Sequence, residues 1–482
     1  MSSTSADEIL TRLTAMRAHD VPTHGGRALA YVYDSGLAEA DALGREVLAL
    51  CGSTNGLDPT AFPSLLTMEQ ELVATAGRLL DAPSGFAGVA TSGGTESVLL
   101  AVLAARDARP DVAAPRMVLP TTAHAAFHKA AHYFRVEPVL VDVDPETKRA
   151  DPVAMAAAID DSTVLVVASA PSYAHGVIDP VTAIAAAARD AGVRCHVDAC
   201  IGGWVLPFLR EDEPDQEPWT FAVDGVTSIS VDLHKYGYTP KGVSLLLHRS
   251  AGLRRSHFFA SAAWPGYTML NTTMQSTKSG GPLAAAWAVV RHIGMDGYRA
   301  LARRARQATL AVAAAVSDIP ALSLAARPDA TLLAITTDET CDVFTIADEL
   351  LARGWYAQPQ LAYGDLPATL HLSISAATAP SVPALVADLQ AATDAAALSG
   401  PVAPSEDLVA AASSVDPAHL DDATVAGLLA VAGMTGSGGS LALPERMAPL
   451  NALLDALPAE LREALLLAVL DRLTRPRPIG AH

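Results

Sequence analysis

Two hydrophobic periods alternate along the chain from about Thr67 to Ile293. Apolar residues spaced three or four apart indicate helices at 68–80 and 95–108, and Ala-rich helical segments follow. Short, nearly unbroken apolar runs indicate buried strands at 116–121, 137–143, 162–170, 193–199 and 226–233, and a further strand runs into a glycine turn at 85–94. Strands separated by helices predict an α/β fold whose mostly parallel central sheet is covered by helices on both faces.

The same patterns divide the chain into four expected segments. Residues 1–66 predict an N-terminal helix and an extended arm, and 67–298 hold the large domain. Residues 299–398 predict a smaller α/β domain, and 399–482 predict a helical appendage with a glycine-rich break at 433–440. Such an appendage packs on the body of the protein or on a partner subunit, or it serves regulation or localisation.

Composition narrows the class of protein. Half of the 482 residues are hydrophobic, which is enough for a large buried core. The 52 acidic residues outnumber the 33 basic ones, giving a net charge of −19 that disfavours nucleic acid or an anionic membrane as the main partner. The start of the chain is not that of a signal peptide, and no apolar segment is long enough for a transmembrane anchor.

The cysteines point to a reducing compartment. The chain has four cysteines, Cys51, Cys195, Cys200 and Cys341, and they are scattered without metal-ligand spacing. We therefore expect reduced, buried thiols, no metal site and a cytoplasmic location.

Candidate chemistry begins at the ends of predicted strands, where ligands of parallel sheets bind. In TSGGTES, the glycines let the backbone approach a ligand closely, and the following helix offers free N–H groups to an anion. Gly93, Gly94 and Thr95 are therefore candidate phosphate donors. Taken alone, such a stretch is more often just a turn before a helix.

Two further strand ends carry a histidine and an acid. His124 follows the strand at 116–121, where an imidazole can stack on a flat ligand or simply cap a helix. His128 and His132 lack the intervening Glu of a zinc-binding HExxH helix. Asp198 ends an apolar strand, and a buried carboxylate there needs a cationic partner.

The stretch SISVDLHKYGYTPKG places His234, Lys235 and Lys241 just after a predicted buried strand. A surface lysine is the ordinary interpretation, but the end of a strand beside a cleft suits a desolvated lysine that acts as a nucleophilic amine. One cofactor satisfies all four strand ends. Pyridoxal phosphate has a phosphate, a flat ring, a ring nitrogen that an acid such as Asp198 keeps protonated, and an aldehyde that forms an imine with lysine.

Beyond this chemistry, the motifs SGGTES, AHAAFHKAAHYF, PSYAHGVIDPV, HVDACIGGWVLPF and SISVDLHKYGYTPKG resemble those of sphingosine-phosphate lyases in order and spacing. These lyases belong to the pyridoxal-phosphate decarboxylases related to glutamate decarboxylase, and the resemblance runs from about Arg27 to Ala396. It implies a fold type I enzyme that is a homodimer with active sites at the subunit interface.

The resemblance also implies residue roles. Lys235 is then the Schiff-base lysine, His124 stacks on the ring, and Asp198 pairs with the ring nitrogen. Gly94, Thr95 and His234 would hold the cofactor phosphate. The stretch QSTKSGG is similar to the family's GSRxGG, which implies phosphate contacts from the other subunit through Thr277 and Gly280.

The reaction follows from a further comparison of motifs. Related decarboxylases carry an Arg in the last strand of the small domain to hold the substrate carboxylate, whereas ATLHLSIS has His371 there, as in the lyases. This implies retro-aldol cleavage of a phosphorylated long-chain base to a fatty aldehyde and phosphoethanolamine. Lys241 resembles a lysine that binds substrate phosphate, Tyr33 a tyrosine near the catalytic centre, and His175 another member of the pocket.

One departure concerns the substrate. The lyase loop usually reads NPLHxDxFP, with a His that helps bind substrate phosphate, but this chain has NGLDPTAFP. Asn55 is kept, while Asp58 stands at the position of the His, where an acid repels a phosphate unless another cation offsets it. Asp58 could instead meet a hydroxyl or an amine.

Three alternatives therefore stay open. The substrate is a small amine or amino acid, with or without a phosphate. An amino-acid decarboxylase would hold its carboxylate through His371 or Lys241, and a related aldolase would act on another β-hydroxy amine. A cofactor-binding scaffold without turnover, working through its C-terminal helices, is the alternative from outside the enzymes.

Overall fold

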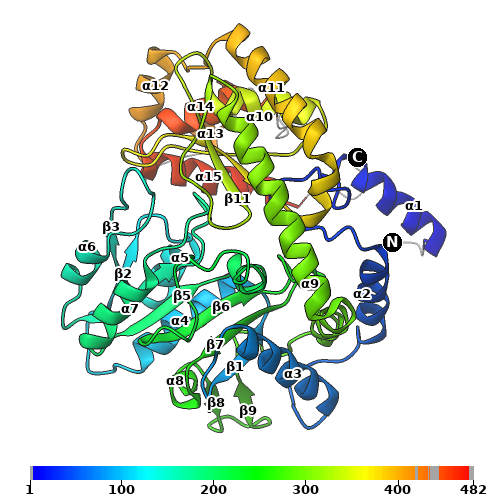
Figure 1. Ribbon diagram of the computed structural model, residues 1–482, viewed down its shortest axis with the longest axis vertical. Helices are drawn as coiled ribbons and strands as arrows, with labels where there is room; N and C mark the ends of the chain where they lie inside the picture. The colour runs from blue at the N-terminus through cyan, green and yellow to red at the C-terminus, as the bar shows by residue number, and fades with distance from the viewer. Residues whose placement is uncertain (1–3, 418–421, 432–433, 435–443, 477–482) are drawn as a thin grey trace. The chain divides into compact units, whose positions relative to one another are not determined.

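The computed structural model describes residues 4–417, 422–431, 434 and 444–476, and Figure 1 shows their course. It divides into two compact units. Unit 1 comprises 1–310, 328–332 and 373–382, and unit 2 comprises 311–327, 333–372 and 383–482. Apart from Met434, the glycine-rich break expected at 433–440 lies outside the described residues.

Unit 1 is built on a seven-stranded sheet with the strand order β1-β7-β6-β5-β4-β2-β3. Strands β2 to β6 are parallel, whereas β7 is antiparallel to both of its neighbours. The mostly parallel sheet is thus confirmed. The strands are β1 (Ala87–Thr91), β2 (Arg116–Pro120), β3 (Glu137–Val141), β4 (Thr163–Ser169), β5 (Arg194–Asp198), β6 (Val226–Asp232) and β7 (Ser244–His248).

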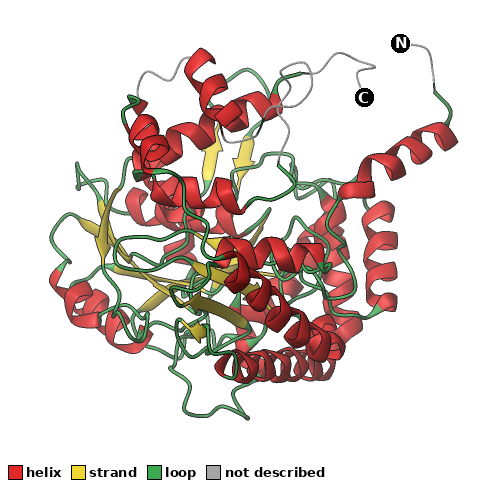
Figure 2. Cartoon of the chain, turned by 90° about the horizontal axis from the view of Figure 1, so that it is seen from above, coloured by secondary structure: helices red, strands yellow, loops and turns green. Residues whose placement is uncertain are grey.

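The apolar strands bury side chains on both faces of this sheet. On β2, Val118 packs into one hydrophobic cluster while Met117 and Leu119 pack into another, because successive side chains point to opposite faces. Helices α3 and α7 share the first cluster, and α4 and α5 share the second. Figure 2 shows helices flanking the strands of unit 1. The expected cover of helices on both faces is therefore confirmed.

Two helices of unit 1 cover the segments for which the hydrophobic spacing predicts helices. The periodic segment at 68–80 belongs to α3, and that at 95–108 to α4. Their bounds are α1 (Ala6–Met16), α2 (Ala38–Leu50), α3 (Pro63–Leu79), α4 (Gly94–Asp107), α5 (Ala126–Phe134), α6 (Pro152–Ala157), α7 (Val181–Asp190) and α8 (Ala251–Arg255). A two-stranded ribbon of β8 (Phe259–Ser261) and β9 (Met269–Asn271) follows α8, and α9 (Gly280–Ser317) leads on toward unit 2.

Unit 2 contains a four-stranded sheet in the order β10-β11-β13-β12 and most of the C-terminal helices. Its strands are β10 (Leu322–Leu324), β11 (Leu332–Thr337), β12 (Gln358–Gln360) and β13 (Thr369–Ser373). Its helices are α10 (Val343–Ala352), α11 (Val382–Ser399), α12 (Glu406–Ser413), α13 (Asp422–Val431), α14 (Ala448–Ala456) and α15 (Ala459–Thr474). The smaller C-terminal α/β domain and its helical tail are thus present. Within the described ranges, no helix has both the length and the hydropathy to cross a bilayer.

Strand register brings the chemical groups of unit 1 together. Ser169 at the end of β4 pairs with Asp198 at the end of β5, and Asp198 pairs with Ser230 of β6. Asp232, the last residue of β6, pairs with Ser244 at the start of the antiparallel β7. Because the carboxyl ends of parallel strands meet at one edge, these residues gather there.

Candidate active site

A cavity of about 390 Å³ lies at this edge of the sheet. The turn before α4, the start of α5 and the ends of β4, β5 and β6 supply its walls. It is lined by Ser92, Gly93, Gly94, Thr95, Glu96, Val98, His124, Ser169, Pro171, Tyr173, Asp198, Cys200, Ile201, Asp232, His234 and Lys235. Seven residues predicted from sequence are therefore neighbours in space: Gly93, Gly94, Thr95, His124, Asp198, His234 and Lys235.

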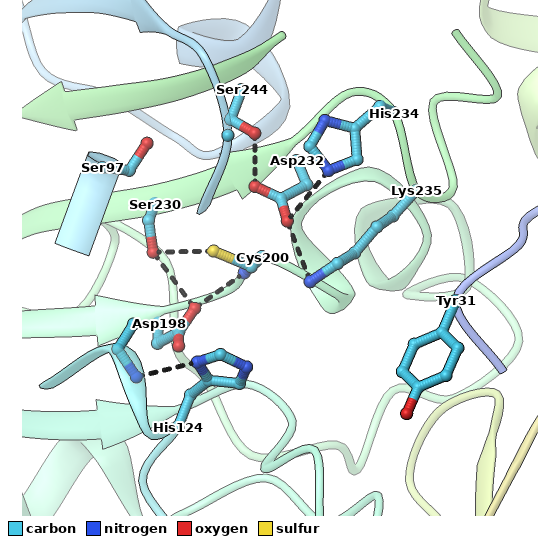
Figure 3. Close-up of polar contacts among 12 residues, drawn as sticks. Tyr31, Ser97, His124, Asp198, Cys200, Ser230, Asp232, His234, Lys235 and Ser244 are labelled. Atoms are coloured by element: carbon cyan, nitrogen blue, oxygen red, sulfur yellow. Dashed lines mark hydrogen bonds and ion pairs between the residues drawn. The ribbon is translucent and has the colours of Figure 1, made fainter. Parts of the chain in front are cut away.

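Lys235 lies in the turn after β6 and reaches across to Asp232, as Figure 3 shows. Its Nζ is 2.8 Å from Asp232 Oδ2, and Ser244 Oγ donates to Asp232 Oδ1 at 2.5 Å. Burial opposes the charge on the lysine, but Asp232, with Tyr33 and Cys200, outweighs it, so the pKa of Lys235 is raised. Burial alone would raise the pKa of Asp232, yet the neighbouring Lys235 ammonium holds it below the usual value. The two side chains form a buried ion pair.

Asp198 occupies the opposite wall of the cavity. Its Oδ1 accepts hydrogen bonds from the backbone N–H of Cys200 at 3.0 Å and from Ser230 Oγ at 3.1 Å. The side chain is buried, and these contacts fix its direction. The described hydrogen bonds to this carboxylate come from neutral donors, so it can still accept one from a protonated ring nitrogen.

His124 precedes α5 beside Asp198 (Figure 3). Its Nδ1 accepts a hydrogen bond from the backbone N–H of Ala126 at 3.1 Å, so the proton of the neutral ring is on Nε2. Burial lowers the pKa of His124 against the opposing effect of Asp198. A neutral, flat ring held in one orientation suits stacking on an aromatic ligand.

The glycine turn brings backbone into the cavity where a side chain has no room. A Cβ atom at Gly94 would lie 2.8 Å from both carboxylate oxygens of Asp232 and 2.8 Å from Cys200 Sγ. Gly94 opens α4, which has no side-chain cap, so its first N–H groups and its positive dipole end face this region. An anion therefore fits here.

Tyr33 and Lys241 lie together near the lysine end of the site. Lys241 Nζ is 5.4 Å from the centroid of the Tyr33 ring and donates to the carbonyl of Tyr31 at 3.0 Å. Burial lowers the pKa of Lys241 to about 8, with Lys235 adding to the effect. Burial also raises the pKa of Tyr33, and Lys235 partly offsets the rise. Tyr33 thus keeps its proton at neutral pH.

Asn55, Asp58, Thr277 and Gly280 form a second group. The loops that carry them are joined by a bridge between Asn55 and Ser279 and by a hydrogen bond from Gly280 N to the Thr54 carbonyl at 2.8 Å. None of the four is among the described residues lining the 390 Å³ cavity. Asp58 is exposed, and its Oδ1 accepts from the backbone N–H of Thr60 at 2.7 Å and from Thr60 Oγ1 at 2.6 Å.

The two remaining candidates are buried histidines. His175 lies in unit 1, in a turn closed by a hydrogen bond from Ser172 N to the Val177 carbonyl, next to a chain segment that lines the cavity. Burial lowers the pKa of His175 to about 4, and Lys148 contributes. His371 is fully buried on β13 in unit 2, where it pairs with Gln358 of β12.

Sequence reasoning missed several polar residues in and beside the cavity, and three of them contact Asp198 or Lys235 or each other. Asp232, Cys200 and Ser230 lie at the ends of β5 and β6, where Asp198 and Lys235 were already expected. The signal for Asp232 was present, because it is an acid closing an apolar strand three residues before the lysine. Its pairing with Ser244 depends on β7, which was not predicted.

The cavity fits pyridoxal phosphate. It combines an uncapped helix start behind glycines, a carboxylate held by neutral donors, a neutral flat imidazole and one buried lysine amine. These meet the phosphate, the ring nitrogen, the ring face and the aldehyde respectively. The fold and this donor set define a fold type I pyridoxal-phosphate enzyme.

Comparisons with known proteins agree with this class. Residues 23–336 match the pyridoxal-dependent decarboxylase conserved domain, and residues 406–472 match the C-terminal HTH domain described for pyridoxal-dependent enzymes. The chain belongs to the pyridoxal-dependent decarboxylase family. The expected cofactor, pyridoxal phosphate, and the expected enzyme class, a pyridoxal-phosphate-dependent lyase, are those of this family and its relatives.

The relatives include several lyases. A sphingosine-1-phosphate lyase of Dictyostelium discoideum is 36% identical over 71% of this chain and 63% of its own length, and that of Arabidopsis thaliana is 33% identical over 80% and 72%. The structure of a sphingosine-1-phosphate lyase from Burkholderia pseudomallei superposes with a TM-score of 0.78 at 33% identity, covering 83% of this chain and 92% of that one. The expected resemblance is confirmed, although the match spans less than two thirds of the Dictyostelium protein.

Proposed function

We propose that the protein is a carbon–carbon lyase that cleaves a phosphorylated long-chain β-hydroxy amine to a fatty aldehyde and phosphoethanolamine. The observation that carries this proposal is the kind of cation at the substrate side of the site, Lys241 against the Tyr33 ring. Among the described residues lining the cofactor cavity, none is an arginine that would clamp an α-carboxylate through two hydrogen bonds. A single ammonium group suits a phosphate. The lyases among the relatives support the same reaction.

Each wall of the cavity then has a role in holding the cofactor. Lys235 anchors it covalently, and Asp198 accepts the hydrogen bond that keeps the ring nitrogen protonated. Gly93, Gly94 and Thr95 offer backbone N–H groups to its phosphate, joined by His234 from the turn after β6. When bound, pyridoxal phosphate supplies a ring that accepts electrons as a bond to the amine-bearing carbon breaks.

The other residues position the substrate. His124, which lines the cavity, would cover one face of the ring and so restrict the substrate amine to a defined position. Lys241 binds the substrate phosphate in its charged form. Because burial raises the pKa of Tyr33, its hydroxyl acts as a hydrogen-bond donor to the substrate hydroxyl and not as the base.

We further propose a cytoplasmic homodimer that shares its sites. Thr277 lies on an exposed loop, and neither it nor Gly280 lines the described cavity of its own chain, so we infer that this loop reaches the cofactor phosphate of a second copy. The four cysteines are free thiols, which fits a reducing compartment. The net charge of −19 argues against nucleic acid as the partner.

Mixing the Lys235→Ala protein with a Thr277 and Gly280 double variant tests the shared site. Only a mixed dimer has one site with both Lys235 and an intact loop at 277–280.

Product analysis tests the reaction. The pure protein is incubated with pyridoxal phosphate and a phosphorylated sphingoid base, and the products are identified by mass spectrometry. We expect a fatty aldehyde and phosphoethanolamine. Release of carbon dioxide from amino acids without this cleavage would establish a decarboxylase instead, and an aldehyde from a non-lipid amine alone would establish a different aldolase.

Lys235→Ala is the matched control. It removes the anchoring amine but leaves Asp198, His124 and the glycine turn in place, so the variant should lose both the visible absorbance of the anchored cofactor and all turnover. Turnover that survives in this variant contradicts the assignment of Lys235.

A further inference from the structure

The ion pair between Lys235 and Asp232 is unusual because the lysine has to react as a neutral amine. The side chains are 19% and 2% exposed, and the charged atoms are 2.8 Å apart. A buried carboxylate at this distance stabilises the ammonium form against the free amine. The same contact that places Lys235 in the cavity therefore makes it unreactive toward an aldehyde.

Neighbouring residues on two sides fix the position of Asp232. Strand register sets Asp232 opposite Ser244, whose hydroxyl donates to Oδ1 at 2.5 Å. On the other side Gly94 packs so closely that a Cβ atom would lie 2.8 Å from each carboxylate oxygen. The hydrogen bond from Ser244 therefore holds the carboxylate in the orientation that meets Lys235. The ion pair is thus a property of the folded sheet.

No second cation replaces Lys235 among the described groups around Asp232. His234 Nε2 is 3.7 Å from Asp232 Oδ2, but burial lowers the pKa of His234, which favours the neutral ring. Lys241 directs its Nζ to the carbonyls of Tyr31 and His234 at 3.0 and 3.4 Å. The titratable groups that act on the pair are Tyr33 from the arm, Cys200 after β5, His124 before α5, and His234 and Lys241 after β6.

We propose that Asp232 is a positioning residue that keeps Lys235 protonated in the cofactor-free protein, so that the lysine captures pyridoxal phosphate only after its proton has been lost to solvent. The inference rests on the role of Lys235 under the proposed function. The Lys235 ammonium first loses one proton to solvent. The freed amine nitrogen then bonds to the aldehyde carbon, and the aldehyde oxygen leaves as water with the two remaining amine protons. Asp232 stays ionised, so it opposes the first step and slows cofactor capture at neutral pH.

The rate of cofactor capture at different pH values tests this proposal. Cofactor-free protein is mixed with pyridoxal phosphate, and the visible absorbance of the anchored cofactor is followed from about pH 6 to about pH 10, the range that brackets a lysine with and without a counter-ion. For the wild type we expect a rate that keeps rising with pH across this range. In Asp232→Asn, burial without a counter-ion lowers the pKa of Lys235, so the profile moves to lower pH. Capture near neutral pH should become about tenfold faster for every pH unit by which the profile moves.

Two variants separate this effect from simple damage. Asp198→Asn removes another buried acid of the same cavity that does not act on Lys235, so it should weaken cofactor retention without moving the pH midpoint of capture. Asp232→Glu restores the charge and should restore the profile of the wild type. Coinciding profiles for the wild type and Asp232→Asn overturn the proposal.

The proposal survives a folding failure of the variant, because the wild-type profile also tests it. A rate that levels off at or below about pH 8 shows a lysine that is already neutral, and this result overturns the proposal. Borohydride reduction followed by peptide mass spectrometry identifies the residue that carries the cofactor. If it is not Lys235, the proposed function fails, and this outcome is distinct from an unchanged profile with the cofactor on Lys235.

Discussion

The glycine turn allows a sharp comparison between adjacent residues. In Gly94→Ala, the new Cβ would lie 2.8 Å from three heavy atoms, the two Asp232 oxygens and Cys200 Sγ. Favourable non-bonded separations begin at about 3.5 Å, so each contact is too short by about 0.7 Å. In Gly93→Ala, the nearest atom to the new Cβ is His234 Cε1 at 3.7 Å, which is ordinary contact. Gly93 has φ 167°, an extended conformation that alanine adopts readily.

The two substitutions should therefore differ strongly in stability. Overpacking a fixed site costs about 1–3 kcal/mol. Gly94→Ala should lie near the upper end, because Ser244 and Lys235 hold the two Asp232 oxygens and Cys200 Sγ is hydrogen-bonded to Ser230. Gly93→Ala loses a few tenths of a kcal/mol of stability at the N-cap of α4, but it gains about as much because the unfolded chain becomes less flexible. We expect it to stay within about 0.5 kcal/mol of the wild type.

Urea unfolding of the cofactor-free proteins measures this difference. Four of the five tryptophans lie in unit 1, including the fully buried Trp204, so the fluorescence reports mainly on that unit. A loss of about 3 kcal/mol corresponds to a midpoint lowered by about 1 M urea for a unit with a slope near 3 kcal/mol/M. Equal midpoints for the two alanine variants would refute the close packing of Gly94 against Asp232. A second readout is the pH profile of cofactor capture, which should move in Gly94→Ala if Asp232 is displaced.

Other side chains of the fold give three more predictions. Burial lowers the pKa of Lys241 to about 8, so the KM for a phosphorylated substrate should rise above about pH 8, and Lys241→Arg should abolish that rise in pH-dependent kinetics. Burial lowers the pKa of His196 from 6.5 to about 4, so between these pH values the unfolded chain binds a proton that the folded chain does not, and the free energy of unfolding falls as the pH drops. In His196→Gln the urea midpoint should therefore fall less steeply with pH over this range. Asp58→Asn should change KM by less than about threefold, because this exposed carboxylate already accepts hydrogen bonds from Thr60; a larger drop in KM would mean that Asp58 faces the substrate phosphate.

The parts of the site that could be predicted from sequence are those whose signature lies within one short segment at the end of a strand. The apolar strands ending at Asp198 and near Lys235, and the glycine turn at Gly94, each have a local signature. The rule that parallel strands present their carboxyl ends at one edge then places them together, and the 390 Å³ cavity shows the result. The sheet and its cover of helices were predictable for the same reason, because periodicity is local.

Long-range pairings were not predictable. Strand β7 is five residues long and antiparallel, and it inserts between β6 and β1, so neither its direction nor its register follows from its sequence. That register brings Ser244 to Asp232. The backbone conformation of Tyr31 was equally unpredictable, because a φ of 63° is rare for a bulky residue. In this conformation the Tyr31 carbonyl accepts a hydrogen bond from Lys241 Nζ. Such contacts depend on the assembled fold.

The charges around the cavity decide where two phosphates can bind. Asp232 is buried, and under the proposed function its carboxylate loses the offsetting charge of Lys235 once the lysine anchors the cofactor. In this proposal the cofactor phosphate is held by the backbone N–H groups and dipole of α4 and by His234, whose pKa burial lowers, so none of these groups loses a charge as the pH rises above neutrality. The substrate phosphate, by contrast, is proposed to have Lys241 as its cation, with a pKa of about 8. Changes in pH above neutrality should therefore weaken substrate binding while cofactor binding persists, which separates the two phosphate sites by their pH dependence.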